Sequence, residues 1–421
     1  MTRPTLLVLS QVYVPDPASV GQHMADAAQE MARRGWRVVV LTSRTGYDDP
    51  AITYPAREVR QGVEIRRLSW ASFGKRSIAA RLLGGVSFVL QAVVQGLRIG
   101  PLDAVLVSTS PPMAGAAALV ISRLRRARLK LWVMDVNPDQ IVALGALGSR
   151  SLLVRLLEWL NRRVLARADD VIVLDRFMAD RINAKRDVCE KLVVLPPWPH
   201  EDALEPVSPA RNPFRAEHGL DGKLVVMYSG NHGPSHPVAT LLGAAARLVD
   251  EPRVVFMFIG GGVGKRDVEA AGLPNVRSLP YQPLDALKYS LSAADLHVVT
   301  MGNGLVGISH PCKVYGAMAV ARAVLLIGPE QSHVGDLLRR DAFGWMVAQG
   351  DVEGVVDLMR LLLDQPREAL VARGQRAHAL IRSELSKSLL CGRLCDVLER
   401  TSSGTRPRSS GRSVPFHPVA G

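Results

Sequence analysis

The chain has 421 residues, enough for two domains of ordinary size, and its 48% hydrophobic and 22% charged content excludes a disordered protein. Lysine and arginine outnumber aspartate and glutamate by 52 to 39. The resulting net charge of +13 favours an anionic partner: nucleic acid, anionic lipid or a phosphorylated substrate. Because only 5% of the residues are aromatic and they do not alternate regularly with basic residues, the composition argues against nucleic acid.

Cysteine usage and hydropathy bear on the cellular compartment. Four cysteines in a chain of this length do not make a disulfide framework. Cys391 and Cys395 have no His or third Cys spaced to complete a zinc site, so we interpret them as reduced core thiols of a cytosolic protein. The apolar run at the N-terminus is too short for a signal peptide. The nearest longer stretch, residues 104–121, contains serines and a Pro-Pro pair, so we expect no membrane-spanning segment.

The first half alternates between strand-like and helix-like runs, which predicts βαβ units around a parallel sheet. The strand-like runs are residues 6–9, 38–41, 104–107, 130–134 and 171–174, and the first helix-like run is 24–34. The loop 13–23 between the first strand and helix is long, which favours a functional role over an ordinary connection. Gly21 in it permits close approach of a ligand to the helix N-terminus.

Residues 65–102 contain six basic residues and no acidic one. The six are Arg66, Arg67, Lys75, Arg76, Arg81 and Arg98. A predicted helix in this stretch places six apolar residues on one face, namely Ile78, Leu82, Val86, Leu90, Val93 and Leu97. Such a stripe usually docks on its own core, but a basic, acid-free helix also fits an element lying on anionic lipid. More basic residues follow at 123–130 and 155–167, and we expect contact with a membrane surface.

Two carboxylates follow the strand-like run 130–134. Asp135 and Asp139 lie at its carboxyl end, where open α/β sheets bind ligands, and they are suited to accept a proton or a sugar hydroxyl. The alternative is helix capping, with Pro138 at an early helical position. Because a cap needs one carboxylate and this loop has two, we favour a functional role.

A proline-rich segment and a second alternating series follow. Strand-like runs occupy residues 224–229, 254–259, 276–279, 295–300 and 323–327, and helix-like runs occupy 237–249, 284–293, 354–364, 368–383 and 386–399. Residues 260–264 are glycine-rich but lack the GxGxxG spacing of a dinucleotide site. We therefore predict Rossmann-like domains at 1–197 and 214–385, a linker at 198–213, a terminal helix at 386–400 and a disordered tail at 401–421. A ligand is expected between the carboxyl edges of the two sheets.

Residues 301–319 combine a strand end, glycines at 302, 304 and 307, and a predicted helix beginning at Lys313. Such a loop presents free backbone N–H groups and the positive end of a helix dipole to an anion. Lys313 adds a positive charge there that suits a phosphate. The alternative is a tight turn with one solvated lysine.

Six groups of residues, in order along residues 5 to about 330, resemble the family-four retaining glycosyltransferases of the GT-B fold. The branch they resemble most builds bacterial exopolysaccharide and O-antigen (the colanic-acid and fucosamine-transferase type). The groups are VPDPASVGQH (14–23), WVMDVNPDQ (132–140), YSGNHG (228–233), FIGGG (258–262), LPYQP (279–283) and the stretch 301–319, with HPCKVY at 310–315 and AMA at 317–319.

The resemblance implies two Rossmann-like domains facing across a cleft, with the C-terminal helix crossing back to the first domain. It also implies a nucleotide-sugar donor, and we expect a UDP-sugar rather than a GDP-sugar. Because no Asp-x-Asp triplet lies at a strand end and no His/Cys cluster has ligand spacing, we expect no metal or other cofactor. The implied donor-binding residues are Gly21, Gly230, Asn231, His232, His236, Gly261, Tyr281, Gln282, Pro283, Ser309, Pro311 and Lys313. The implied acceptor-binding residues are Val20, Gln22, His23 and Asn137. The catalytic candidates are Lys313, Asp135 and Asp139.

The chain departs from the family pattern at two places. Many members carry two glutamates eight residues apart, where this chain has Ile308 and Gly316; the branch named above tolerates glycine at the second. A basic residue usually follows the Ser-Gly-Asn turn, where this chain has Pro234, with His232 and His236 nearby. Neutralisation of a phosphate therefore depends more on Lys313 and on helix dipoles.

The sequence thus predicts a retaining glycosyltransferase that moves a sugar from a nucleotide-sugar to a lipid-linked glycan in bacterial cell-surface polysaccharide synthesis. We expect it in the cytoplasm, peripheral on the inner face of the cell membrane, without a nucleic-acid partner. Two alternatives stay open. One is a catalytically weakened homologue that acts as a membrane assembly scaffold. The other is a sugar-nucleotide epimerase or hydrolase, which would need paired carboxylates beyond Asp135 and Asp139.

Overall fold

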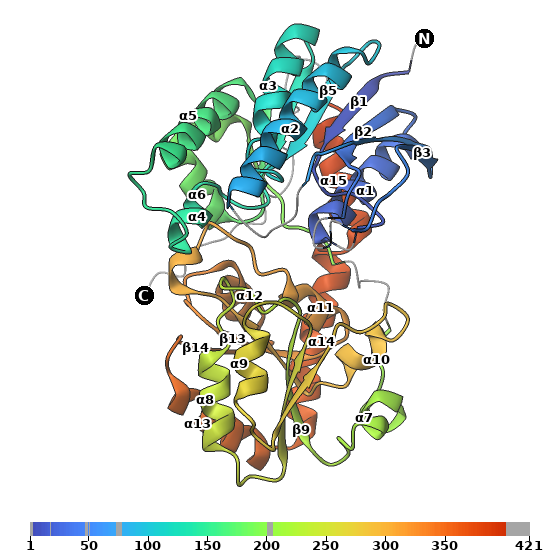
Figure 1. Ribbon diagram of the computed structural model, residues 1–421. Helices are drawn as coiled ribbons and strands as arrows, with labels where there is room; N and C mark the ends of the chain where they lie inside the picture. The colour runs from blue at the N-terminus through green and yellow to red at the C-terminus, as the bar shows by residue number, and fades with distance from the viewer. Residues whose placement is uncertain are drawn as a thin grey trace.

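Figure 1 shows the computed structural model of the chain, which describes residues 3–16, 18–46, 49, 51–72, 78–199 and 205–400, the side chains of 78 and 79 excepted. Three expectations fall outside the described residues. They are the disordered tail 401–421, the linker segment 200–204, and the basic residues Lys75 and Arg76.

The first domain is built on a sheet whose described strands run in the order β3-β4-β2-β1-β5-β6-β7-β8, parallel except for β3. The strands are β1 (Thr5–Leu9), β2 (Arg37–Ser43), β3 (Arg57–Arg60), β4 (Val63–Leu68), β5 (Ala104–Ser108), β6 (Arg128–Trp132), β7 (Asp170–Val173) and β8 (Leu192–Val194). The helices are α1 (Ser19–Arg33), α2 (Ile78–Leu97), α3 (Ala114–Arg125), α4 (Asp139–Ala143), α5 (Leu152–Arg167) and α6 (Arg176–Lys185). Strands β1 and β5 are buried along their whole length, as expected for parallel strands covered on both faces.

The buried face of α2 differs from our prediction. This helix packs against α3 through glycines: a Cβ on Gly85 would lie 2.9 Å from the side chain of Met113, and one on Gly96 would lie 2.5 Å from that of Ile121. Because small residues make the contact, larger ones face outward, and Val86 and Leu90, predicted on the core face, are 47% and 63% exposed. Among the described helices, α2 alone is long and apolar enough to span a membrane, over Ala80–Leu97, although we expected no such segment.

The second domain has a parallel sheet whose described strands run in the order β11-β10-β9-β12-β13-β14. The strands are β9 (Leu224–Ser229), β10 (Val254–Ile259), β11 (Val276–Leu279), β12 (Leu296–Thr300), β13 (Ala323–Ile327) and β14 (Gly344–Val347). The helices are α7 (Pro213–Glu217), α8 (Ala239–Arg247), α9 (Lys265–Ala270), α10 (Leu287–Ser292), α11 (Lys313–Ala319), α12 (His333–Asp341), α13 (Val352–Asp364) and α14 (Arg367–Glu384). The fold is thus the predicted pair of Rossmann-like domains, one above the other in Figure 1.

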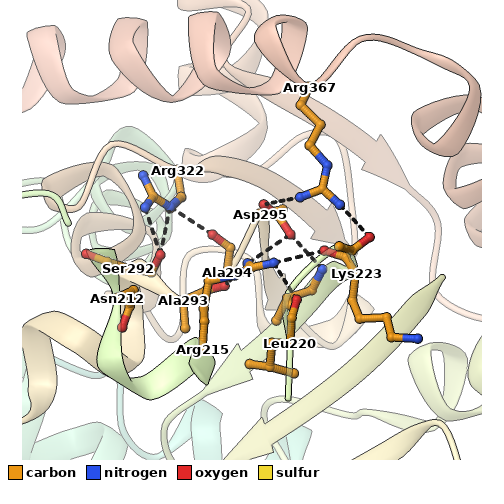
Figure 2. A network of polar contacts seen from close by, with 12 residues as sticks. Asn212, Arg215, Leu220, Lys223, Ser292, Ala293, Ala294, Asp295, Arg322 and Arg367 are labelled. Carbon is orange, nitrogen blue, oxygen red and sulfur yellow. Dashed lines mark hydrogen bonds and ion pairs between the residues drawn. The ribbon is translucent and has the colours of Figure 1, made fainter. Parts of the chain in front are cut away.

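Two arginines anchor the segment that enters the second domain (Figure 2). Arg215 is buried and donates to the carbonyls of Ala293 (2.6 Å) and Leu220 (2.8 Å) and to the Asp295 carboxylate (3.2 Å). Arg322 donates to the carbonyl of Val207 in the linker, at 2.6 Å. Buried carbonyls need donors, so these guanidinium groups fasten the incoming chain to the sheet.

The last helix, α15 (Lys387–Leu398), crosses back and packs on α1, which confirms the predicted crossing (Figure 1). The buried Lys130 ammonium of β6 donates to the carbonyls of Val397 and Arg400 at the end of α15, both at 3.0 Å, and pairs with Asp170 at 2.5 Å. A lysine below the last helical turn satisfies carbonyls that have no partner within the helix.

Both chain crossings between the domains meet at Asp26 of α1. Its carboxylate accepts from the indole N–H of Trp198, where the linker begins, at 2.9 Å. It also pairs with Lys387, the first residue of α15, at 2.7 Å.

Candidate active site

The carboxyl edges of the two sheets touch through two loops. Residues 133–138 follow β6 in the first domain, and residues 301–312 follow β12 in the second. Asp135 and Ser309 form an antiparallel bridge, and the amide of Val136 donates to the carbonyl of Ile308 at 2.8 Å. The site predicted between the sheet edges therefore has a defined meeting point.

Lys313 is the first residue of α11, and its half-buried side chain lies across the end of β9. A Cβ on Gly230 would lie 2.6 Å from Lys313 Cε, and the ammonium stands 5.4 Å from the ring centre of Tyr228. Burial lowers the pKa of this ammonium to about 8. Within the described residues no carboxylate pairs with it. A cation that burial makes costly and that no protein anion compensates is suited to an anionic ligand.

Glycine turns at the ends of β9 and β10 lie beside Lys313. Gly230 and Gly260 have φ values of 134° and 131°, a region that residues with a side chain rarely adopt. The amide of His232 donates to the carbonyl of Gly261 at 2.7 Å, and the hydroxyl of Tyr228 donates to that of Asn231 at 2.7 Å. The expected donor-binding residues Gly230, Asn231, His232 and Gly261 therefore form one folded unit.

The two histidines expected near the diphosphate are both held neutral. Burial lowers the pKa of His232, and the Nε2 atom of its buried ring has no hydrogen-bond partner in the part of the chain that the structure describes. Burial, followed by the charge of Lys313, lowers the pKa of His236 to about 3. At neutral pH these rings act as hydrogen-bonding groups rather than as cations. Among the described residues, two lysines remain as cations at this edge. Lys265 already donates to the carbonyls of Gly260 and Leu279, at 3.0 and 2.9 Å, and lies 3.9 Å from Glu269, so Lys313 is the better placed to meet an anion.

Tyr281, Gln282 and Pro283, expected beside the nucleotide base, follow β11 at the rim of the same edge. The ring of Tyr281 is 61% exposed and approaches Gly261, where an added Cβ would lie 3.1 Å from it. The side chain of Gln282 donates to the carbonyl of Pro280 at 3.0 Å.

Asp135 lies on the opposite edge and is bound to the second domain. Its Oδ1 accepts from the Ser309 hydroxyl at 2.8 Å and from Gln140 Nε2 at 3.0 Å, and Gln140 also donates to Ser309 Oγ at 2.8 Å. Thr109 Oγ1 accepts from the amide of Asp135 at 3.1 Å and fixes the backbone. Burial raises the pKa of Asp135 to about 6, because the two hydrogen bonds only partly offset the cost of desolvating its charge. Pro311 is buried behind Ser309.

Asp139, expected to be catalytic with Asp135, has a different environment. It begins α4 and pairs with Lys185 at 2.6 Å and with Arg181 at 3.0 Å, both on α6. Two cations therefore already pair with this carboxylate, as is typical of a structural ion-pair network. These ion pairs favour the structural alternative for Asp139, and the catalytic role expected of Asp135 stays a prediction.

The residues expected to meet the acceptor are mostly used inside the first domain. His23 is 2% exposed, and its ring nitrogens lie 2.8 and 2.9 Å from the carbonyls of Ser19 and Trp198, so it is a core residue and not a free contact. Gly21, expected to bind the donor, packs against the backbone of Tyr13, which would lie 3.1 Å from a Cβ added to Gly21. Asn137 lines a cavity of about 30 Å³, which is room for a water molecule and not for a sugar. Val20 and Gln22 on α1 are half-buried.

Sequence reasoning missed a buried group of polar side chains between the domains. Asp175 lies between β7 and α6 and caps α6, His310 precedes Lys313 by three residues, and His333 begins α12. His310 Nδ1 lies 2.8 Å from Asp175 Oδ2, and the Tyr315 hydroxyl lies 2.7 Å from His310 Nε2 and 3.0 Å from His333 Nε2. A carboxylate at the end of a strand was a signal for Asp175, but nothing in the sequence places it beside His310.

The same group bears on our expectation that no metal site exists. One ligand atom from each of Asp175, His310 and His333 lies within 4.8 Å of the others, close enough to hold a metal ion. Sequence spacing did not reveal this group because its members come from two domains. In this arrangement their polar atoms bond to one another and to Tyr315.

Comparisons with known proteins agree with this fold. Residues 19–198 match the glycosyl transferase 4-like domain. The chain is 24% identical over 357 residues to WbjE of Pseudomonas aeruginosa, named as a glycosyltransferase, covering 82% of this chain and 86% of that one. It is 24% identical over 401 residues to WcaI of Escherichia coli (strain K12), whose name assigns it to colanic acid biosynthesis, covering 91% of this chain and 98% of that one.

Two solved structures have the same fold. HepE of Anabaena, crystallised with UDP and glucose, superposes with a TM-score of 0.70 at 14% identity, covering 94% of this chain and 99% of its own. WaaG, a glycosyltransferase involved in lipopolysaccharide biosynthesis, superposes with a TM-score of 0.67 at 17% identity, covering 94% and 100%. Together with the domain match, these similarities identify the chain as a glycosyltransferase of the GT-B fold, whose residues 19–198 are similar to the family-four type.

Proposed function

We propose that this glycosyltransferase moves a sugar from a UDP-sugar to a lipid-linked glycan acceptor, with retention of anomeric configuration, in bacterial cell-surface polysaccharide synthesis. One observation carries the proposal: the half-buried Lys313 ammonium, without a carboxylate partner among the described residues, beside the glycine turns of β9 and β10. A diphosphate is the anion that this arrangement suits, because it supplies charge to Lys313 and acceptors to the glycine-rich backbone.

The chemistry assigned to these residues is electrostatic. As the bond between sugar and diphosphate breaks, negative charge grows on the leaving phosphate, and Lys313 stabilises that charge more strongly than it stabilises the bound donor. The leaving phosphate itself assists attack from the same face of the sugar, so retention requires no protein nucleophile. We propose that no metal takes part.

The choice of donor and pathway is supported by the relatives. HepE was crystallised with UDP and with UDP-glucose, and WcaI is named for colanic acid biosynthesis. Gly261 and the exposed ring of Tyr281 offer a flat surface at the rim on which a uracil ring can stack.

A membrane surface is the partner we propose for the first domain. Neighbouring helices α2, α3 and α5 expose large apolar side chains. The most exposed are Leu83 and Leu90 on α2, Leu124 on α3 and Leu152 on α5, with exposed fractions of 63–79%. We call the face that these helices share with Trp159 the α2–α5 face. Arginines flank it: Arg98, Arg123, Arg155 and Arg162 are exposed, and Arg163 lies 5.1 Å from the Trp159 ring centre. Apolar residues with an arginine–tryptophan border are typical of an element that lies on anionic lipid.

The structure narrows which basic residues can take part. Arg66 and Arg67, counted in the basic stretch 65–102, lie on β4 and pair with Glu64 (2.5 Å) and Glu58 (2.6 Å). They are therefore internal to the first domain, and the membrane proposal depends on the α2–α5 face.

Donor and mechanism are tested together. UDP- and GDP-sugars are screened for thermal stabilisation, and those that bind are assayed for transfer to membrane lipid extracts, with the product anomer read by NMR. We expect stabilisation by UDP-sugars, a retained anomer and full activity in a chelator. Binding of GDP-sugars alone would refute the UDP-sugar donor, and an inverted product would refute retention. An absolute need for magnesium or manganese would refute a reaction without metal.

Membrane contact is tested with Leu90→Ser and Trp159→Ser in one chain and sedimentation on vesicles that contain phosphatidylglycerol. The matched control carries Leu361→Ser and Val371→Ser, two side chains exposed to a similar degree on the second domain. We expect the first variant to leave the vesicles and the control to stay bound. Equal sedimentation of both variants would contradict the proposal.

A further inference from the structure

A continuous chain of hydrogen bonds runs from the first domain into the second just before Lys313. Asp175 belongs to the first domain, and His310, Tyr315 and His333 belong to the second. Burial lowers the pKa of His333 to about 3, so its ring is neutral. Burial alone would raise the pKa of Asp175, but the hydrogen bond from His310 and the other favourable interactions of the carboxylate outweigh burial, and the net pKa lies below the ordinary value. Asp175 is therefore ionised and His310 Nδ1–H is its donor.

This assignment fixes the direction of every bond. With Nδ1 protonated, His310 Nε2 accepts from the Tyr315 hydroxyl, which accepts in turn from His333 Nε2–H. Each member has a partner, so the ring of His310 has one defined orientation. A fully satisfied buried network is a strong determinant of local geometry.

The segment held by this network leads directly into α11. Gly307 packs against the backbone of Phe177, Ser309 donates to Asp135, and His310 donates to Asp175, all in the first domain. The carbonyl of Ile308 also accepts from the amide of Val136, so four of the six residues before Lys313 contact the first domain. The position of Lys313 depends on contact between the domains as well as on its own sheet.

We propose that Asp175 and His310 are positioning residues that orient the loop 307–312, so that the Lys313 ammonium faces the leaving phosphate when the two domains are in contact. Neither touches the donor, because both side chains are at most 4% exposed. The inference rests on the proposed role of Lys313 and adds that the first domain helps to build the diphosphate site. Loss of the contact lowers turnover more than it lowers affinity for UDP.

Two amide substitutions separate the two bonds of His310. In His310→Asn the amide nitrogen takes the place of Nδ1 and still donates to Asp175, whereas in His310→Gln the amide group reaches the place of Nε2 and keeps the bond to Tyr315. Arg176→Ala is the matched control, because Arg176 follows Asp175 and pairs across the domains with Asp336, at 2.6 and 3.0 Å, without touching the loop. Asp336 keeps Arg339 as a partner in this variant.

We expect kcat to fall about tenfold or more in His310→Gln, the loss of one hydrogen bond to a charged group, and to stay within about threefold of wild type in His310→Asn and Arg176→Ala. The Kd for UDP, measured by calorimetry, should change by less than about threefold in all three. Equal kcat values for the two His310 variants would overturn the inference while leaving wild-type transfer intact. An equal loss of kcat in Arg176→Ala would also overturn the inference. Breaking any contact between the domains would then lower kcat, and the bond between His310 and Asp175 would have no specific role.

X-ray scattering of the free proteins gives a readout that needs no substrate. His310→Gln should have a larger radius of gyration than His310→Asn, because only the former loses the bond to Asp175. Identical scattering of the two variants would overturn the inference even if no donor were found. Absence of UDP binding and transfer in the wild type would instead refute the proposed function.

Discussion

Each of the two facing sheet edges carries an ionisable side chain whose pKa is shifted by burial, Lys313 on the second domain and Asp135 on the first. On the second domain burial lowers the pKa of Lys313 to about 8, and on the first domain burial raises the pKa of Asp135 to about 6. Both shifts disfavour the charged form, and neither group forms an ion pair among the described residues. The difference lies in their partners. Two neutral side chains already donate to Asp135, whereas the Lys313 ammonium donates to no group among the described residues and lies 5.4 Å from the ring centre of Tyr228.

This comparison separates a group that awaits a ligand from a group that is already held. The cost of burying Lys313 without an anion is recovered when a diphosphate binds. Asp135, in contrast, joins the domains through Ser309 and needs no ligand to be placed. We therefore expect Lys313 to dominate catalysis and Asp135 to have the smaller role.

The largest effect is expected for Lys313→Ala. A lysine–phosphate contact in a partly dry site is worth about 1.5–3 kcal/mol, which corresponds to roughly a ten- to hundredfold loss of kcat. Turnover should fall more than donor affinity, because the contact strengthens as charge grows on the leaving phosphate. Steady-state kinetics and UDP-sugar titration measure both quantities. Arg360→Ala, an exposed charge on α13, is the control, and near-wild-type turnover of Lys313→Ala would move the phosphate site to His232 and His236.

The pH profile tests the same cation without a mutation. The Lys313 pKa of about 8 lies below its ordinary value, so the ammonium is present at pH 7 and deprotonates as the pH rises through 8. A cation needed for binding and turnover predicts that kcat/KM falls about tenfold between pH 7 and pH 9. Lys313→Arg should lose this basic limb, because arginine stays charged. A basic limb that persists in Lys313→Arg would assign it to another group.

Asp135→Asn probes the first-domain edge. The amide keeps an oxygen that accepts from Ser309 and Gln140 but removes the negative charge. We expect kcat to fall about fivefold, comparable to one neutral hydrogen bond. The wild-type profile should lose activity as the pH falls through about 6, where Asp135 protonates, and the variant should lack that limb. An unchanged acid limb in Asp135→Asn would remove Asp135 from the reaction.

Stability gives Asp135 an independent readout. Its pKa is about 6 in the folded chain against an ordinary 3.8, so the folded state binds its proton more tightly than the unfolded state. The resulting stabilisation is complete below pH 4 and is lost as the pH rises through 6. Relative to wild type, the melting temperature of Asp135→Asn should therefore rise between pH 4 and pH 7. A constant difference would mean that the carboxylate is not desolvated.

Much of the fold could be predicted because local signals agreed. Apolar runs such as 224–229 and 254–259 became β9 and β10 with those bounds. The pair β3 and β4 was missed, since its alternate positions carry arginines and glutamates that pair with one another across the strands. The buried face of α2 was misplaced because glycines, which carry no apolar signal, make its contact with α3.

The site residues could be predicted only where they lie close together in the sequence. The glycine turns and Lys313 were identified because they lie in short motifs beside strand ends. The bond between Asp175 and His310 joins residues 135 positions apart, and no periodicity relates them. His23 was assigned to the acceptor from the resemblance. Its burial against Trp198 could not be predicted, because that contact depends on where the linker crosses.

The smallest effect is expected for Asp139→Asn, which separates the two carboxylates that the sequence could not distinguish. Asp139 is held by Arg181 and Lys185 on α6, and Lys185 keeps Glu158 as a second partner at 2.6 Å when Asp139 is neutralised. The α4–α6 contact therefore survives, and kcat should stay within about twofold of wild type, a change of under about 0.5 kcal/mol in the barrier. Loss of the two pairs should lower the free energy of unfolding by about 1 kcal/mol, because both are only partly exposed. Denaturant unfolding and steady-state kinetics on the same preparation measure these two outcomes. A fall in kcat as large as that of Asp135→Asn would restore the catalytic role that the pairing of Asp139 argues against.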